Sequence, residues 1–246
     1  MSRTYQFFAD DIDLVKSEAV IMGTEHIHLK KVLRLRKGEK ILVSDGKGAL
    51  FHAVISRVGK ESTSAFLLYP VRRDPEPSFD ITLIQAIPRR RKMEWILQKS
   101  TELGVVCIVP VFSEYSVPHI QNERWQRKKE RWTKIIKEAA KQSYRGAIPF
   151  LTDLMSFDIA ISRYRAALNI LCTPDGEWSL RRCLSDFREV QQVTVAIGPE
   201  GGFSHSEAAY AVDGGFVSCT LGPRVLRLET AVVKVLAVLQ YVYGDG

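Results

Sequence analysis

Residues 193–207, VTVAIGPEGGFSHSE, contain the loop that decides the fold class. An apolar, strand-like run ends at the glycine-rich residues 198–202 (GPEGG), and a helix-like pattern follows. Glycine lets the backbone approach a ligand closely, and loops at the carboxyl ends of parallel strands form the usual ligand crevice of α/β sheets. The glycine spacing matches neither a dinucleotide fingerprint nor a Walker phosphate loop. We therefore expect a binding loop of another kind, with a plain strand-to-helix turn as the alternative.

Residues 221–231, LGPRVLRLETA, repeat this arrangement further along the chain. A Gly-Pro pair ends a strand-like run, and an apolar helix pattern begins after two arginines three residues apart. Arg224 and Arg227 could clamp an anion, or one of them could pair with Glu229; solvated arginines are the alternative. The helix that follows is apolar nearly all round, which predicts burial in a core or in a subunit interface.

The first 70 residues contain short β-prone runs and little helix, which favours a small β-barrel. We expect strands at 5–8, 40–44, 49–58 and 64–71, with one short helix near 26–35. Residues 70–79 hold three prolines and mixed charge, as is typical of a linker. The expected domains are a barrel over residues 1–72, a linker over 73–79 and a second domain over 80–246.

Strand-like and helix-like runs alternate after residue 80, which points to an α/β domain with a mainly parallel sheet. Gly104 is placed to end the first helix of this domain, and Ser204 and Glu207 match a capping box at the start of a later one. We expect strands at 81–87, 105–109, 168–172, 193–197 and 216–221, and helices at 92–103, 123–143, 204–213 and 229–243, with another between 172 and 193.

Positive charge is concentrated in one third of the chain. The whole sequence carries a formal charge of +7, of which residues 1–79 contribute +3 and residues 89–145 contribute +8, whereas the remainder is −4. The stretch 124–137, RWQRKKERWTKIIK, places basic side chains around Trp125 and Trp132. The seven-residue spacing of the two tryptophans favours packing in the protein core over stacking on nucleic-acid bases. For the basic residues of 89–145, contact with phosphates is therefore a better interpretation than a helix face that is merely solvated.

Several classes of protein are disfavoured by composition. No apolar run is long enough for a membrane span, and the N-terminal residues MSRTYQFFADD carry acids where a signal peptide needs an apolar core. The four cysteines lie far apart without CxxC spacing, so we expect neither a zinc site nor a disulfide framework, and no metal. The scattered histidines suggest no hydrolase triad. A reduced, cytoplasmic protein of one large or two modest domains is the expectation.

These motifs, in this order, resemble the RsmE family of 16S rRNA (uracil-N3)-methyltransferases, within the SPOUT superfamily. The segments that carry the resemblance are 28–36 (HLKKVLRLR), 85–104 (QAIPRRRKMEWILQKSTELG), 110–117, 131–145 (RWTKIIKEAAKQSYR), 197–207 and 221–231. The resemblance implies a small PUA-like β-barrel domain followed by a SPOUT-type α/β domain with a deep trefoil knot. It also implies a homodimer, S-adenosyl-L-methionine as methyl donor, and 16S rRNA or the 30S subunit as partner.

The resemblance also assigns roles to particular residues. The residues implied to hold the cofactor are Thr173, Gly198, Pro199, Glu200, Gly201, Gly202, Leu221, Gly222, Val225 and Leu226. The basic residues expected to contact RNA are Arg34, Arg36, Arg89, Arg90, Arg91, Lys92, Arg124 and Lys128. For catalysis we expect Arg227 or Arg145 to stabilise the uracil anion and Glu200 to accept the N3 proton.

The chain departs from the family pattern at three places. Tyr115 and Leu228 stand where the family usually has arginine and threonine, and residues 89–91 replace a Lys-Gly-Asp-like stretch. The first change puts an RNA or catalytic role at that position in doubt, and the last could strengthen phosphate contact. Two other functions stay open: a SPOUT methyltransferase acting on another RNA such as tRNA, and a non-catalytic RNA-binding assembly factor.

Overall fold

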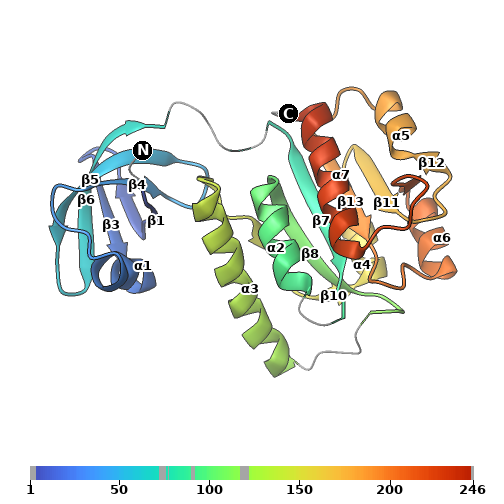
Figure 1. Ribbon diagram of the computed structural model, residues 1–246, viewed down its shortest axis with the longest axis horizontal. Coiled ribbons are helices and arrows are strands. Elements are labelled where there is room, and N and C mark those ends of the chain that lie inside the picture. Colours follow the sequence, from blue (N-terminus) through green and yellow to red (C-terminus); the bar gives the residue numbers. More distant parts are fainter. Residues whose placement is uncertain (1–3, 72–75, 77, 90–91, 117–121, 245–246) are drawn as a thin grey trace. The chain divides into compact units, whose positions relative to one another are not determined.

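The computed structural model describes residues 4–71, 76, 78–89, 92–116 and 122–244. The chain divides into two compact units. The N-terminal unit comprises Met1–Glu76 together with Ala140–Ile148, and the C-terminal unit comprises Pro77–Ala139 and Pro149–Gly246. Each unit has its own sheet (Figure 1). The division after Glu76 falls inside the linker expected at 73–79, most of which lies outside the described residues.

The N-terminal unit is a curled six-stranded sheet in the order β1-β4-β5-β6-β3-β2 (Figure 1). Its strands are β1 (Gln6–Phe8), β2 (Asp11–Asp13), β3 (Glu18–Met22), β4 (Lys40–Ser44), β5 (Leu50–Val58) and β6 (Ser62–Pro70). All neighbours are antiparallel except β1 and β4, which run parallel. Alternate side chains from these strands, among them Ile21, Ile41 and Ile55, are buried in one apolar cluster, as expected of a sheet with one face turned inward.

The short helix expected at 26–35 is displaced toward the N-terminus. Helix α1 (Gly23–Ile27) follows β3 without a connecting loop and continues into the π-helical segment η1 (His28–Val32). Gly23 has φ +54°, which lets the chain turn directly from strand into helix. Arg34 also has positive φ, +55°, and the helical segment ends before it.

The C-terminal unit contains an eight-stranded sheet in the order β10-β8-β7-β13-β11-β14-β12, with β9 also paired to β8. Every pairing in it is parallel, which confirms the expected sheet type. The strands are β7 (Asp80–Ala86), β8 (Val105–Phe112), β9 (Phe150–Leu151), β10 (Met155–Ser156), β11 (Leu168–Cys172), β12 (Trp178–Ser179), β13 (Gln192–Ile197) and β14 (Val217–Thr220). The helices are α2 (Lys92–Glu102), α3 (Asn122–Gln142), α4 (Phe157–Arg163), α5 (Leu180–Asp186), α6 (His205–Asp213) and α7 (Leu228–Tyr243).

Apolar side chains pack the helices onto this sheet. Helix α2 contacts α7, and α4 contacts α6 (Figure 1). Phe157 and Ile161 of α4 share a buried cluster with Ile84 and Val109 of the sheet. Trp125 and Trp132 are both buried and meet edge to face, with ring centroids 5.6 Å apart, so the prediction that they face the core is confirmed.

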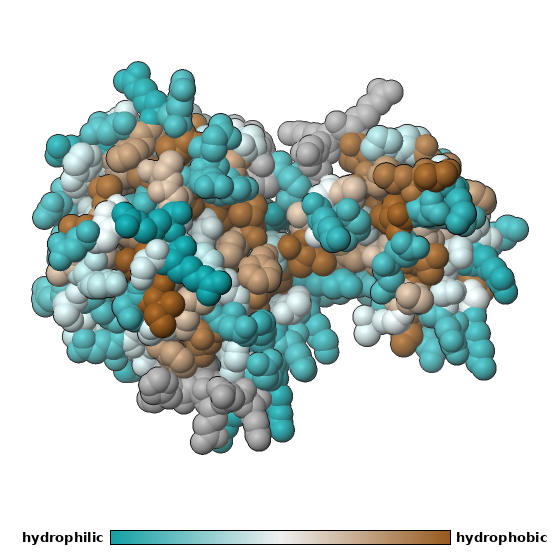
Figure 2. Space-filling view, turned by 180° about the vertical axis from the view of Figure 1, so that it is seen from behind, coloured by the Kyte–Doolittle hydropathy of each residue, from teal (hydrophilic) through white to brown (hydrophobic). Residues whose placement is uncertain are grey.

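Local signals at the helix ends are also confirmed. Ser204 and Glu207 form the reciprocal capping box at the start of α6, and Gly104 has φ +82° just after α2. On the face shown in Figure 2, hydrophobic residues are exposed in patches among hydrophilic ones. Within the described ranges, no helix has the length and apolar character needed to cross a membrane.

Candidate active site

The three loops singled out in the sequence leave neighbouring strands of the C-terminal sheet. Strands β13, β11 and β14 are adjacent and parallel. Their carboxyl ends line up to within one residue, because Cys172, the last residue of β11, is the register partner of both Ile197 of β13 and Cys219 of β14. The segments that follow these strands therefore emerge at one edge of the sheet, which is where α/β proteins bind ligands.

Glycine is required at two positions in the loop after β13. A Cβ on Gly198 would lie 2.8 Å from the carbonyl carbon of Gly202, and Gly202 itself has φ +74°. The amide of Gly202 donates to the carbonyl of Pro199 at 3.0 Å and closes a tight turn. The buried amide of Gln85 donates to the carbonyl of Ala86 behind this loop. The loop thus folds back on itself so closely that no side chain fits at Gly198.

The loop after β11 is tied to the end of strand β14. Thr173 donates its amide to the carbonyl of Cys219 at 3.1 Å, and its hydroxyl lies 3.4 Å from that of Ser218. A Cβ on Gly176 would lie 2.3 Å from the carbonyl carbon of Cys219. Gly222 has φ +119°. Thr173 and Gly176 therefore lie against the end of the strand from which the predicted cofactor loop 221–226 leaves.

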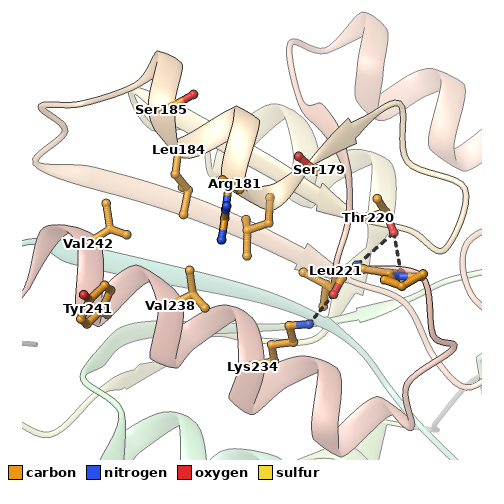
Figure 3. Close-up of a pocket in the computed structure, with 13 residues that line it drawn as sticks. Ser179, Arg181, Leu184, Ser185, Thr220, Leu221, Lys234, Val238, Tyr241 and Val242 are labelled. Atoms are coloured by element: carbon orange, nitrogen blue, oxygen red, sulfur yellow. Dashed lines mark hydrogen bonds between the residues drawn. The ribbon is translucent and has the colours of Figure 1, made fainter.

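A pocket of about 780 Å³ lies beside the loop after β14 (Figure 3). Leu221, Gly222 and Pro223 line it on one side, and residues of α5 and α7 line the rest. Most of the lining side chains are apolar, and Lys234 donates to the carbonyl of Leu221 at its edge (Figure 3). Leu221 and Gly222 are the predicted cofactor residues in this pocket; Val225 and Leu226 follow in the same loop, where Val225 is 87% exposed.

Glu200 is the charged residue of the glycine loop and is held from two sides. Its Oε2 accepts the amide of Arg89 at 3.1 Å, and its Oε1 lies 3.2 Å from Nζ of Lys92. Lys92 also lies 3.2 Å from Oε2 of Glu229, in the first turn of α7. Partial burial opposes ionisation of Glu200, but hydrogen bonds from the amides of Arg89 and of Glu200 itself, and from Lys92, outweigh it and lower the carboxyl pKa. The side chain is therefore charged at neutral pH.

The two arginines expected to act in catalysis lie in different units. Arg227 is the N-cap residue of α7, at the end of the loop after β14, and it is exposed. Arg145 is 2% exposed and belongs to the N-terminal unit, where its guanidinium pairs with Glu76 at 2.7 Å. Arg227 is thus the arginine that shares a loop with predicted cofactor residues.

The predicted RNA-contacting residues are distributed over both units. Arg34 and Arg36 are exposed in the N-terminal unit, and Arg124 and Lys128 are exposed on α3. Arg89 is exposed beside the glycine loop, whereas Lys92 pairs with two carboxylates. Arg90 and Arg91 lie outside the described residues. No group of three or more potential metal-ligating side chains occurs among the residues that the structure describes.

Two of the contacts that the glycine loop makes were not predicted from the sequence. Tyr115, which stands in place of the usual family arginine, lies against Gly201: a Cβ there would be 3.2 Å from the Tyr115 Cβ. Lys92 was expected to bind phosphate rather than to bridge Glu200 and Glu229. No sequence spacing signals either contact, because the partners lie on separate strands and helices.

Comparisons with known proteins agree with this geometry. A family model described as an RNA methyltransferase domain matches residues 74–240, and one described as an RNA methyltransferase PUA domain matches residues 28–66. The chain is 31% identical over 227 residues to ribosomal RNA small subunit methyltransferase E of Bacillus subtilis, covering 90% of this chain and 89% of that protein. This chain belongs to the ribosomal RNA small subunit methyltransferase E family. A Synechocystis relative of the same name is 32% identical, with 89% of this chain and 71% of that protein covered.

Solved structures of similar proteins share the fold over nearly the whole chain. The structure of the Neisseria gonorrhoeae enzyme bound to S-adenosyl methionine aligns with a TM-score of 0.88 and 30% identity, covering 99% of both chains. A Legionella pneumophila protein in complex with the cofactor SAM aligns with the same TM-score and 32% identity, covering 99% of this chain and 100% of that one. The expected SPOUT-type α/β domain and PUA-like domain are therefore confirmed, while the deep knot stays a prediction.

Proposed function

We propose that this protein is an S-adenosyl-L-methionine-dependent methyltransferase that methylates N3 of a specific uridine in 16S rRNA. The observation that carries the proposal is the meeting of three glycine-containing loops at the carboxyl ends of β13, β11 and β14, in a fold that binds S-adenosyl methionine in the Neisseria relative. The family membership supports rRNA as the substrate class.

The residues of these loops suit the proposed cofactor. Close backbone packing at Gly198 and Gly176 fixes the shape of these loops, because a side chain at either position would clash with neighbouring backbone. The mainly apolar pocket beside Leu221 and Gly222 offers an environment for an aromatic ring. We assign cofactor binding to the backbone of these loops, together with Thr173. When bound, the sulfonium cofactor supplies an electrophilic methyl group.

The protein must then activate uracil N3, which is a poor nucleophile while it carries its proton. We assign stabilisation of the resulting anion to Arg227, an electrostatic role for a preorganised cation. Arg227 is preferred over Arg145, because it is exposed at the end of a cofactor loop while Arg145 is buried against Glu76. Glu200 is the candidate proton acceptor because it is an ionised carboxylate in the glycine loop, although the hydrogen bonds that lower its pKa also make it a weaker base.

The remaining assignments concern the oligomeric state, the cellular location and the RNA partner. We propose that the protein acts as a homodimer in the cytoplasm on 16S rRNA or the 30S subunit. Tyr241 is 78% exposed and Val242 is 44% exposed on α7. Both also line the pocket beside Leu221 and Gly222, so a second subunit that contacts this apolar end of α7 would border that pocket. The exposed cations of α3 suit phosphate contact.

The test is methyl transfer in vitro followed by nucleoside mass spectrometry. Purified protein is incubated with S-adenosyl-L-methionine and 16S rRNA, 30S subunits or tRNA, and 3-methyluridine is measured after digestion. A product confined to 16S rRNA or 30S subunits is expected. Methylation of tRNA alone would favour another RNA substrate, and RNA binding with no transfer to any RNA would favour an assembly factor.

A further inference from the structure

We propose that Lys92 is a positioning residue that joins the glycine loop to the start of α7, and thereby aligns the two cofactor loops; this inference rests on the proposed function. Nζ of Lys92 lies 3.2 Å from Oε1 of Glu200 and 3.2 Å from Oε2 of Glu229. One ammonium group thus connects the first turn of α2 with the loop after β13 and the first turn of α7.

The bridge is reinforced from the same segment of chain. The amide of Arg89 donates to Oε2 of Glu200 at 3.1 Å, so the carboxylate is bound through both of its oxygens. Helices α2 and α7 also contact each other directly (Figure 1). The ion pairs of Lys92 therefore add to an interface in which α2 already packs against α7.

The charges explain why a cation is needed between the two loops. Without Lys92, two carboxylates would face a shared site with unfavourable mutual repulsion. Burial disfavours the charge of Lys92, but its pairing with the carboxylates of Glu200 and Glu229 together outweighs burial and raises the Lys92 pKa. Lys92 is consequently a permanent cation at neutral pH.

The position of Glu229 links the bridge to catalysis. Arg227 is the N-cap residue of α7, and Glu229 lies two residues after it in the first turn. Lys92 therefore restrains the helix start that presents Arg227, while Glu200 restrains the loop between Pro199 and Gly201. A small displacement of either loop would change the alignment of cofactor and acceptor base, to which transfer rates are sensitive.

The expected contribution to overall stability is small. The three side chains are 29%, 30% and 27% exposed, and partly solvated ion pairs contribute little to folding. A positioning role and a merely structural role can therefore be separated by measuring activity and unfolding on the same variants.

Lys92→Met tests the bridge, with Lys99→Met as the matched control. Lys99 lies on the same helix, is 32% exposed and pairs with Glu102 at 2.7 Å, but contacts neither cofactor loop in the described structure. For Lys92→Met we expect kcat to fall by roughly tenfold to a hundredfold, a weaker cofactor affinity by calorimetry, and a nearly unchanged KM for RNA. Lys92→Arg should restore most of the activity, because it preserves the charge. Lys99→Met should match the wild type in kcat and match Lys92→Met in thermal stability.

Three results would overturn the inference. Equal kcat and cofactor affinity in the Lys92→Met and Lys99→Met variants would show that the bridge does not position the loops. A loss confined to KM for RNA would make Lys92 a phosphate contact, and a fall in thermal stability much larger than that of Lys99→Met would make it a structural residue. If the wild type methylates no RNA, the proposed function fails, but the calorimetric comparison still tests Lys92.

Discussion

The carboxylate of Glu76 accepts two hydrogen bonds from the guanidinium of Arg145, at 2.7 Å and 3.1 Å, and one from the amide of Ala147 at 2.8 Å. Glu76 follows the strands of the N-terminal unit, whereas Arg145 follows helix α3. The pair therefore joins two distant parts of the chain into one unit. Gln6 adds to the same junction by donating to the carbonyl of Arg145 at 2.6 Å.

Glu76→Gln should destabilise the N-terminal unit. The Arg145 side chain is 3% exposed and that of Glu76 is 16% exposed, and removal of one partner from a buried ion pair typically costs about 3 kcal/mol. Urea denaturation followed by circular dichroism measures the loss in the free energy of unfolding. Glu61→Gln, at an exposed position of the same unit, is the control and should change stability little. Equal effects of the two substitutions would contradict a stabilising role for the pair.

Arg227→Ala should abolish methyl transfer while leaving cofactor affinity largely intact. Arg227 is exposed at the N-cap of α7, and loss of one preorganised group that stabilises developing charge lowers kcat by roughly a hundredfold to a thousandfold. Single-turnover transfer assays and calorimetry with S-adenosyl-L-methionine measure the two quantities. Arg188→Ala removes another arginine of the same unit, whose Nε donates to the carbonyl of Ser185 at 3.4 Å, and should retain activity. Full activity of Arg227→Ala would rule out the assignment.

Glu200 should make stability depend on pH in the acid range. Its pKa is lower in the folded protein than its ordinary value, so the folded state favours the ionised carboxylate. This contribution is complete above the unfolded pKa, which is about 4.3 for a glutamate, and is lost as the pH falls through the lower pKa of the folded protein. Urea unfolding across this range should show a shallower loss for Glu200→Gln than for the wild type. The exposed Glu114→Gln is the control and should follow the wild-type curve; a parallel curve for Glu200→Gln would disprove the linkage.

Replacing Arg124 and Lys128 together with glutamine should weaken RNA binding and its dependence on salt. Both side chains are exposed on α3, and each lost phosphate contact lowers the salt slope of binding by about 1. Filter binding of 16S rRNA over a range of salt concentrations measures the slope. Lys129→Gln is the control, because Lys129 already pairs with Asp153 at 2.6 Å. Cofactor affinity should be unaffected in both variants, and an unchanged slope in the double variant would remove α3 from the RNA surface.

Much of the local structure could be predicted because its causes are local. Ser204 and Glu207 are three residues apart, which is the spacing that a reciprocal cap requires. Gly104 marks a helix end because glycine adopts positive φ at little cost. Trp125 and Trp132 are seven residues apart, so the helical repeat places both on one face. The α/β alternation and the glycine loops followed from the same kind of short-range pattern.

Elements with few residues were harder to predict. Strands β9, β10 and β12 have two residues each, too few for an alternating pattern to be distinguished from loop. The helix expected at 26–35 begins earlier and contains a π-helical segment, because Gly23 lets the chain turn immediately after β3. Such departures depend on one backbone position rather than on periodicity.

The sequence by itself determined the family, the alternation of elements and the loops that carry the site, since these depend on residues close together in the chain. Only the tertiary structure decided that Arg145 pairs with Glu76 in the N-terminal unit and that Lys92 joins Glu200 to Glu229. An ion pair forms between whichever charges the strand order and helix packing bring within a few ångströms. In this chain those partners are separated by more than a hundred residues for Lys92 and by 69 for Arg145, so no local pattern could assign them.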